Sequence, residues 1–420
     1  MLTYRALFAH PEFRALWCSS ALSTVAATMS SLALATVVHR TTGSALLTAV
    51  AMFGPSMAQV LGATTLMSAA DASPPRRTLT LVGGLTTVAL GLQTIPGLST
   101  ASRLLVVLGA AYVISVGSGV RWGLLSEVVP PDSFALARST MNVAVGAFQV
   151  VGFATSGLLL ATFTAPQVFL LATLVSAAAV PVLRFGIAER SPRRSTRAGL
   201  GETWRGNQEL LAHRHTRTLL LALCLPNGLI VGCEALFVPY ADEQAGWLLA
   251  AGAIGMLTGD LVVGRFLTAD VRRRTNPGLR LLLAAPFLVF VFDPGIPLAA
   301  LLVACATVGY GAGLAQQEWL VALTPPALRG QVLGAESSVR MTFQGVCAVL
   351  AGALADLIPT GTAMSVLAAA SILVSLSLTP ALRRAADAAT PSFPARGRTA
   401  VTTQLGEVTD SGGSPSGAPP

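Results

Sequence analysis

Long apolar runs separated by short polar turns make up most of the chain. A helix that crosses the hydrocarbon core of a bilayer needs about 20 apolar residues, and the runs reach that length many times. They predict twelve membrane-spanning helices, which we place at residues 15–38, 44–70, 78–98, 103–126, 139–161, 165–184, 217–240, 245–267, 277–293, 297–322, 331–358 and 361–382. The ninth span is the weakest, because its uncharged run covers only 281–292, and eleven spans is the alternative count.

The two halves of the chain resemble each other. At a fixed offset of 195, residues 130–157 match residues 325–352 at six positions, which include Phe148-Gln149 with Phe343-Gln344 and Gly157 with Gly352. A second similarity relates residues 39–47 to residues 242–249. Two similar hydrophobic halves in the same order are typical of duplicated transporter bundles. The pattern therefore predicts an all-α membrane protein with two six-helix bundles, 1–185 and 217–384, related by a pseudo-two-fold axis.

The composition supports a membrane protein, since 53% of the residues are hydrophobic and only 11% are charged, whereas soluble domains are about 25% charged. The lipid bilayer is therefore the main partner of the chain. Two longer polar segments remain. The linker 186–216 includes residues 200–213, which fit an amphipathic surface helix. The tail 385–420 is rich in Ser, Thr, Gly and Pro and is predicted to be disordered.

The arginines predict the orientation. All 27 basic residues are arginine, and with a cytoplasmic N-terminus 23 of them fall in cytoplasmic segments. Only Arg40 and Arg103 lie in external turns, and Arg121 and Arg340 lie within spans. Because positive charge is enriched in cytoplasmic loops, this distribution predicts a plasma-membrane protein with both termini cytoplasmic. It also accounts for the net charge of +8 without nucleic acid as a partner.

The motifs at residues 41–47, 124–132, 137–142 and 323–334 together resemble the major facilitator superfamily, closest to its branch of siderophore and macrolide exporters. Residues 124–132, followed by 137–142, resemble the run that ends the fourth helix of that branch and opens the fifth. Residues 323–334 resemble the run between helices ten and eleven, and 41–47 resemble the first external loop. The resemblance covers about residues 12–384. It implies the major facilitator fold, a small-molecule substrate, alternating access, export and a monomer.

The gating loop of that family, between helices two and three, is partly present. Asp71 stands at the acidic position, and Arg76 and Arg77 supply the basic end. Met67 replaces the leading glycine, and Ala72 replaces the arginine that follows the acid. Such a loop acts as a charged latch that holds one gating state, so a latch with missing parts is expected to hold it less tightly. The alternative is that the arginines only anchor the topology.

Charged residues inside predicted spans are the first candidates for function. An unpaired charge at the bilayer centre costs roughly 2.5–3.5 kcal/mol, so such residues usually face a cavity or a partner. Glu234 in span seven and Asp260 in span eight are flanked by uncharged residues. We interpret them as candidates for carrying protons or binding a cationic substrate. The alternative is a structural carboxylate satisfied by neighbouring hydroxyl groups or by an arginine.

A second group of polar residues is expected near spans ten and eleven. Glu336 and Arg340 are spaced i,i+4 with the acid first, which favours an ion pair on one helix face. Glu318 could join them. Arg121 corresponds to Gln316 at the offset of 195, so polar groups are expected at matching depths in both halves. These residues could line a central cavity, or they could form one static salt-bridge cluster.

The sequence favours transport over catalysis. No Gly-x-x-x-x-Gly-Lys-Ser/Thr run occurs, so ATP is not expected to drive the chain directly. We expect no cofactor, and His213 and His215 fit a solvated loop better than a metal site. No paired acids or loop nucleophile suggest an enzyme. We therefore predict a secondary transporter that exports a small amphipathic molecule by alternating access, coupled to protons.

The alternative function is a non-transporting relative, either a membrane sensor or an assembly subunit. Its support is the incomplete gating loop and Phe153, which stands where exporters of this family usually have a proline that kinks helix five.

Overall fold

The structure is a computed structural model that describes residues 4–71, 74–130, 134–190, 213–325 and 329–389. Every regular element in these ranges is helical. The N-terminal half contains α1 (Tyr4–Ala9), α2 (Pro11–Thr42), α3 (Ala45–Asp71), α4 (Pro75–Leu92), α5 (Thr100–Val128), α6 (Phe134–Leu160) and α7 (Ala165–Gly186). The C-terminal half contains α9 (Arg214–Ala235), α10 (Phe237–Ala241), η2 (Asp242–Gln244), α11 (Ala245–Leu261), η3 (Val262–Phe266), α12 (Ala269–Leu282), η4 (Ala285–Phe292), α13 (Ile296–Thr307), η5 (Val308–Gly311), α14 (Ala312–Ala322), α15 (Arg329–Ala355) and α16 (Thr360–Ala389).

Ten helical segments within the described ranges are long and apolar enough to cross a membrane, against twelve predicted spans. One of the ten, Arg214–Phe266, has 53 residues and holds both the seventh and the eighth predicted span. It is interrupted at η2, where Asp242 has a φ of 44°. The third predicted span is α4, which is not among the ten and carries two arginines and four threonines in 18 residues. Each predicted span therefore falls on a helical segment.

Local sequence explains where several helices begin and end. Gly43 follows α2 with a φ of 65°, a conformation that glycine adopts without strain. Ser99 caps α5, because its hydroxyl oxygen accepts a hydrogen bond of 3.1 Å from the backbone N–H of Ser102. The weak ninth span continues from α12 into the 3-10 helix η4, at whose start Pro286 offers no N–H for a helical bond.

Two predicted segments between and after the halves are only partly described. The predicted surface helix at 200–213 lies outside the described residues except for His213, which precedes α9. α16 continues to Ala389, so the chain is helical for five residues of the predicted tail. The reason is packing, since Ala385 and Ala386 are buried. The remainder of the tail lies outside the described residues.

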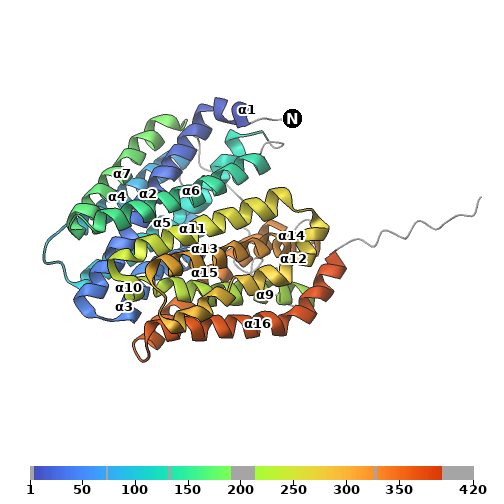
Figure 1. Ribbon diagram of the computed structural model, residues 1–420. Coiled ribbons are helices and arrows are strands. Elements are labelled where there is room, and N and C mark those ends of the chain that lie inside the picture. Colours follow the sequence, from blue (N-terminus) through green and yellow to red (C-terminus); the bar gives the residue numbers. More distant parts are fainter. Residues whose placement is uncertain (1–3, 72–73, 131–133, 191–212, 326–328, 390–420) are drawn as a thin grey trace, which may run out of the picture.

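The two halves lie face to face (Figure 1). The largest contacts between them are made by two helix pairs, α3 with α15 and α6 with α11. α1 and the last turns of α16 lie at the same end of the bundle, which we call the termini end. The other end, which carries Gly43 and η2, we call the distal end.

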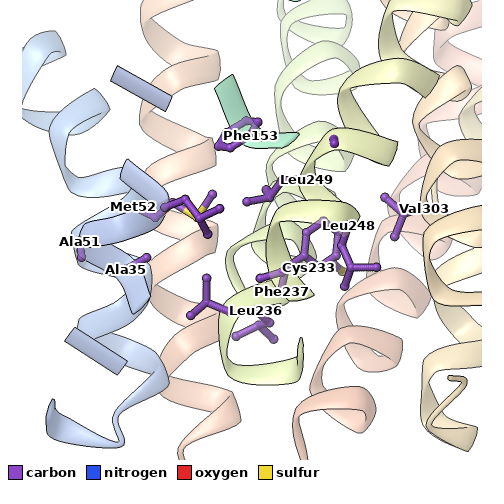
Figure 2. Packing of buried hydrophobic residues seen from close by; sticks show 14 of the residues in the cluster. Ala35, Ala51, Met52, Phe153, Cys233, Leu236, Phe237, Leu248, Leu249 and Val303 are labelled. Carbon is purple, nitrogen blue, oxygen red and sulfur yellow. The ribbon is translucent and has the colours of Figure 1, made fainter. Parts of the chain in front are cut away.

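Buried apolar residues form different cores at the two ends. The largest cluster contains residues of both halves, and Figure 2 shows Met52 and Phe153 of the N-terminal half beside Phe237 and Leu249 of the C-terminal half. We call it the shared core. Two smaller clusters lie toward the termini end, and each belongs to one half: one surrounds Phe13 and Leu124, the other Leu220 and Leu382, with their neighbours.

Glycines allow the halves to approach closely at the distal end. A Cβ atom added to Gly246 of α11 would lie 2.5 Å from the Cα of Gly157 in α6. A Cβ added to Gly352 of α15 would lie 2.7 Å from the Cα of Leu46 in α3. No larger side chain fits these contacts without moving the backbone. Gly157 and Gly352 are the matched glycines of the internal repeat.

Candidate functional site

A cavity of about 1600 Å³ lies between the two halves. Helices α2 to α6 line one side, and α9, α11, α14 and α15 line most of the other. The lining extends to Tyr4, Arg138 and Arg265, which are exposed at the termini end. Toward the distal end it stops at Phe237 and Leu249 of the shared core. The cavity is therefore open at the termini end and closed at the distal end.

Polar contacts between the halves reinforce the closed distal end. Arg40 of α2 pairs with Asp242 at 3.3 Å and with Glu243 at 2.6 Å. The carboxylate of Asp356, just after α15, accepts hydrogen bonds from the Ser44 hydroxyl at 2.9 Å and from the Ala45 backbone N–H at 2.7 Å. Asp356 thus sits at the N-terminus of α3, where a negative charge is favourable. The Arg40 pairs join the similar segments 39–47 and 242–249 across the interface, and Asp356 joins the first of these segments to the end of α15.

At the termini end, the ion pairs among described residues stay within one half. In the N-terminal half, Arg190 pairs with Glu12 at 2.6 Å, and Arg76 pairs with Glu189. The hydrogen bonds that Arg190 donates to the Glu12 carboxylate raise the pKa of Arg190. In the C-terminal half, Arg273 pairs with Asp387 at 3.1 Å. None of these pairs bridges the halves, so none of them closes the cavity.

The structure describes the side chains of only the basic end of the predicted latch. Arg76 contacts Glu189, which follows α7, so this arginine ties α4 to the end of α7. Arg77 is exposed. Asp71 ends α3, and its side chain lies outside the described part of the chain.

Glu234 lies at the closed end of the cavity. It is the second-last residue of α9, and its neighbours Cys233 and Ala235 are fully buried. The Tyr310 hydroxyl in η5 donates a hydrogen bond of 2.9 Å to Glu234 Oε1. Among the described residues no arginine pairs with this carboxylate. Glu234 and Tyr310 both line the cavity.

Glu336 and Arg340 form the predicted ion pair on α15. Arg340 Nε lies 2.9 Å from Glu336 Oε1, and the Glu336 side chain is only 3% exposed. Gln317 of α14 adds a long hydrogen bond of 3.4 Å to the same carboxylate. Glu318 does not join them: it is half exposed and pairs with Arg272 at 2.5 Å. Consecutive residues of a helix point about 100° apart, so Gln317 and Glu318 face different surroundings.

The remaining predicted charges, Asp260 and Arg121, lie on opposite walls of the cavity. Asp260 of α11 is exposed and has no hydrogen-bond partner among the described residues. Arg121 of α5 makes one long hydrogen bond of 3.5 Å to the Ser20 hydroxyl, and its buried Nε has no partner in the described part of the chain. The carboxylates of the lining, Glu234, Asp260 and Glu336, all come from the C-terminal half.

Sequence reasoning did not identify several polar residues of the cavity. Gln344 donates a hydrogen bond of 2.7 Å to Asn227, and Gln149, its counterpart in the repeat, also lines the cavity. The repeat itself was a usable signal, since both glutamines belong to its matched positions. No sequence pattern pointed to Tyr310, because it lies in a short 3-10 segment between Gly309 and Gly311.

This architecture is similar to known transporters. The model of the family described as Major Facilitator Superfamily matches residues 16–335. The chain is 29% identical over 265 residues to the multidrug efflux pump Tap of Mycolicibacterium fortuitum, an alignment that covers 59% of this chain and 63% of that relative. The chain thus spans slightly less than two thirds of the length of Tap.

Two solved structures share the fold. The nucleoside transporter NupG superposes with a TM-score of 0.70 at 11% identity, covering 88% of this chain and 99% of NupG. A bacterial homolog of the human lysosomal transporter Spinster, in an inward-facing and unoccupied conformation, superposes with a TM-score of 0.63 at 16% identity, covering 90% and 95%.

Proposed function

The chain belongs to the Major Facilitator Superfamily, and on this premise we propose that it is a proton-coupled exporter of a small amphipathic molecule. Membership confirms the resemblance drawn from the sequence and makes the protein a membrane transporter rather than an enzyme. Proton coupling, export and the chemical class of the substrate are the parts that we propose.

Alternating access explains the difference between the two ends of the bundle. A transporter of this kind exposes one central site to each side of the membrane in turn as its halves rock. The cavity is open at the termini end and closed at the distal end. With the termini in the cytoplasm, as the arginine distribution predicts, this is the state in which an exporter loads its substrate. Similarity to the efflux pump Tap supports export.

The cavity lining supports an amphipathic substrate. Its walls are largely apolar, with side chains such as Phe53, Val107 and Ile114, and amide groups are placed among them at Gln59, Gln149 and other positions. Apolar walls with a few convergent polar groups are typical of sites for small organic molecules. Arg121 offers an additional donor for an acceptor group of the substrate.

Glu234 carries the proposal of proton coupling. Its carboxyl group has a hydroxyl partner, Tyr310, and no described counter-ion, and it lies where the cavity meets the shared core. When the distal end opens and the termini end closes, water reaches a group at this position from the other side of the membrane. A carboxyl group there takes up a proton from one side and releases it to the other. Tyr310 orients the carboxyl group in both protonation states, as donor or as acceptor.

The test compares small molecules in cells and in medium for a strain that lacks the chain and is complemented with variants. Wild type is expected to release one or more compounds that the deletion strain retains, and Glu234→Gln is expected to behave as the deletion does. The matched control is Glu318→Gln, which removes an exposed carboxylate that does not line the cavity. Export that persists with Glu234→Gln would contradict its role as the proton carrier. Wild type that matches the deletion would favour the non-transporting alternative.

A further inference from the structure

A second, smaller cavity of about 300 Å³ lies at the termini end of the C-terminal half. Helices α12, α14 and α16 form its walls. Its lining is strongly basic, with Arg273, Arg274, Arg280 and Arg383, while Asp387 is the acidic residue of the lining. Asp387 is already paired with Arg273 at 3.1 Å. The pocket therefore carries an excess of positive charge that its own side chains do not neutralise.

Part of this positive charge is buried, at Arg280. The residue is 3% exposed and forms no ion pair with a described carboxylate. Its Nη2 donates to the Ser375 carbonyl oxygen at 2.9 Å, and its Nη1 reaches the Thr379 hydroxyl at 3.4 Å. Its Nε is buried without a partner among the described residues. A buried cation without an anion nearby is energetically costly, so a bound anion would provide the negative charge that Arg280 lacks.

Topology alone does not account for this arrangement. Arginines that fix the orientation of a membrane protein need only lie in cytoplasmic loops, where water solvates them. Arg280 is buried, and it faces the same pocket as Arg383 from a different helix. Residues on three helices that converge on one pocket form a site rather than a charged loop.

The pocket lies at the depth of the lipid headgroups. α16 has 30 residues and is therefore about 45 Å long at 1.5 Å per residue, whereas the hydrocarbon core measures about 30 Å. Counted from Thr360 at the distal end, roughly 20 residues cross that core. Arg383 and Asp387 lie beyond it, in the zone of the headgroups.

We propose that this pocket binds a phosphate group, held by Arg280 from below and by Arg274 and Arg383 from the rim. Guanidinium groups bind phosphate through paired, charge-assisted hydrogen bonds, and basic pockets between membrane helices bind the headgroups of anionic lipids. The phosphate belongs either to such a lipid or to a soluble phosphate ester. Arg280 also lines the central cavity, but the proposal does not rest on the transport function, because the pocket contains neither Glu234 nor Tyr310 and neither Arg383 nor Arg384 lines the central cavity.

The lipid arm of the test uses the purified full chain in nanodiscs of phosphatidylcholine with a minor fraction of phosphatidylglycerol. Native mass spectrometry counts the phosphatidylglycerol molecules that stay bound. Arg383→Gln is expected to weaken retention about fivefold, the effect of one basic residue at an anionic surface. The matched control is Arg384→Gln, which is adjacent on α16, exposed and absent from the pocket lining. It is expected to retain the lipid as wild type does.

The soluble arm titrates inorganic phosphate and glycerol 3-phosphate, by calorimetry, into the same protein in nanodiscs of phosphatidylcholine alone. Saturable binding that Arg383→Gln weakens and Arg384→Gln does not would identify a soluble phosphate as the source. Lipid retention with that same pattern, without such binding, would identify the lipid. Equal losses in both variants, or no binding in either arm, would overturn the proposal. Both substituted residues are exposed, so the variants are expected to fold.

Discussion

The distal and termini ends of the bundle differ in what their side chains contact. At the distal end, apolar residues of both halves share one core, two glycine contacts bring the backbones together, and Arg40 and Asp356 bond across the interface. At the termini end, each half has its own small core and its own ion pairs. An ion pair can therefore stabilise a closed end only where it joins the two halves, and a short distance between its charged atoms within one half does not close the cavity.

The contacts at the distal end also differ in strength. Arg40 is 46% exposed and its partners are about as exposed, and such surface pairs contribute about 0–1 kcal/mol. Buried aromatic side chains contribute several times more. We conclude that apolar packing provides most of the free energy that holds the distal end closed and that the charged pairs add a smaller contribution.

The largest effect is expected from Phe237→Ala. Phe237 is fully buried in the shared core and stacks on Phe287 with ring centroids 6.3 Å apart. Its loss is expected to cost about 3–5 kcal/mol, mostly in the state with the distal end closed. Spin labels at positions 42 and 244 would show a longer distance. The control, Phe13→Ala, removes an equally buried ring from the core of one half, so it is expected to lower stability without changing that distance.

A smaller effect is expected from Gly246→Ala. The added methyl group would lie 2.5 Å from the Cα of Gly157, so α6 and α11 must separate, at about 1–3 kcal/mol. A cysteine introduced at position 44 is expected to react faster with a water-soluble maleimide. Gly84→Ala in α4 is the control, because its added methyl group meets open space. Equal labelling rates in the two variants would mean that the glycine contact does not hold the end closed.

Asp356→Asn is expected to weaken the closed end by about 1 kcal/mol, the scale of a charge at a helix N-terminus. The change removes the negative charge that accepts hydrogen bonds from Ser44 and the Ala45 N–H. Hydrogen exchange of the Ala45 amide is expected to become faster, while exchange elsewhere in α3 stays unchanged. Protection equal to that of wild type would argue against this contact.

The smallest effect is expected from Arg40→Gln, at most about 1 kcal/mol. Because the pairs with Asp242 and Glu243 are exposed, salt screens them. In wild type the distance between the spin labels is expected to lengthen slightly at high salt, and in Arg40→Gln it should no longer respond. Arg190→Gln at the termini end is expected to keep the salt response of wild type. If the distance in Arg40→Gln still changed with salt, other charges would be responsible for the salt response.

The sequence predicted best what depends on local spacing. Apolar runs located the helical segments, and the i,i+4 spacing predicted the contact of Glu336 with Arg340. Contacts that depend on tertiary packing could not be assigned to particular residues, although a hydroxyl partner was one alternative for Glu234. Glu318 pairs with Arg272, Arg76 pairs with Glu189, and Glu234 accepts a hydrogen bond from Tyr310, 76 residues away. No local pattern connects such positions, because the packing of separate helices decides them.

The internal repeat shows which positions the two halves share and where they differ. The matched positions include the glycines of the two backbone contacts, Gly157 and Gly352, and the cavity glutamines Gln149 and Gln344. The charges of the cavity do not match: Arg121 corresponds to Gln316, Glu336 to Met141, and Arg340 to Val145. The two halves thus share the glycines of the close contacts, and among the described residues of the cavity lining the acids come from the second half. The half that carries the carboxylates is therefore the one in which proton coupling is proposed, while the other half lines the cavity with the arginines Arg121 and Arg138.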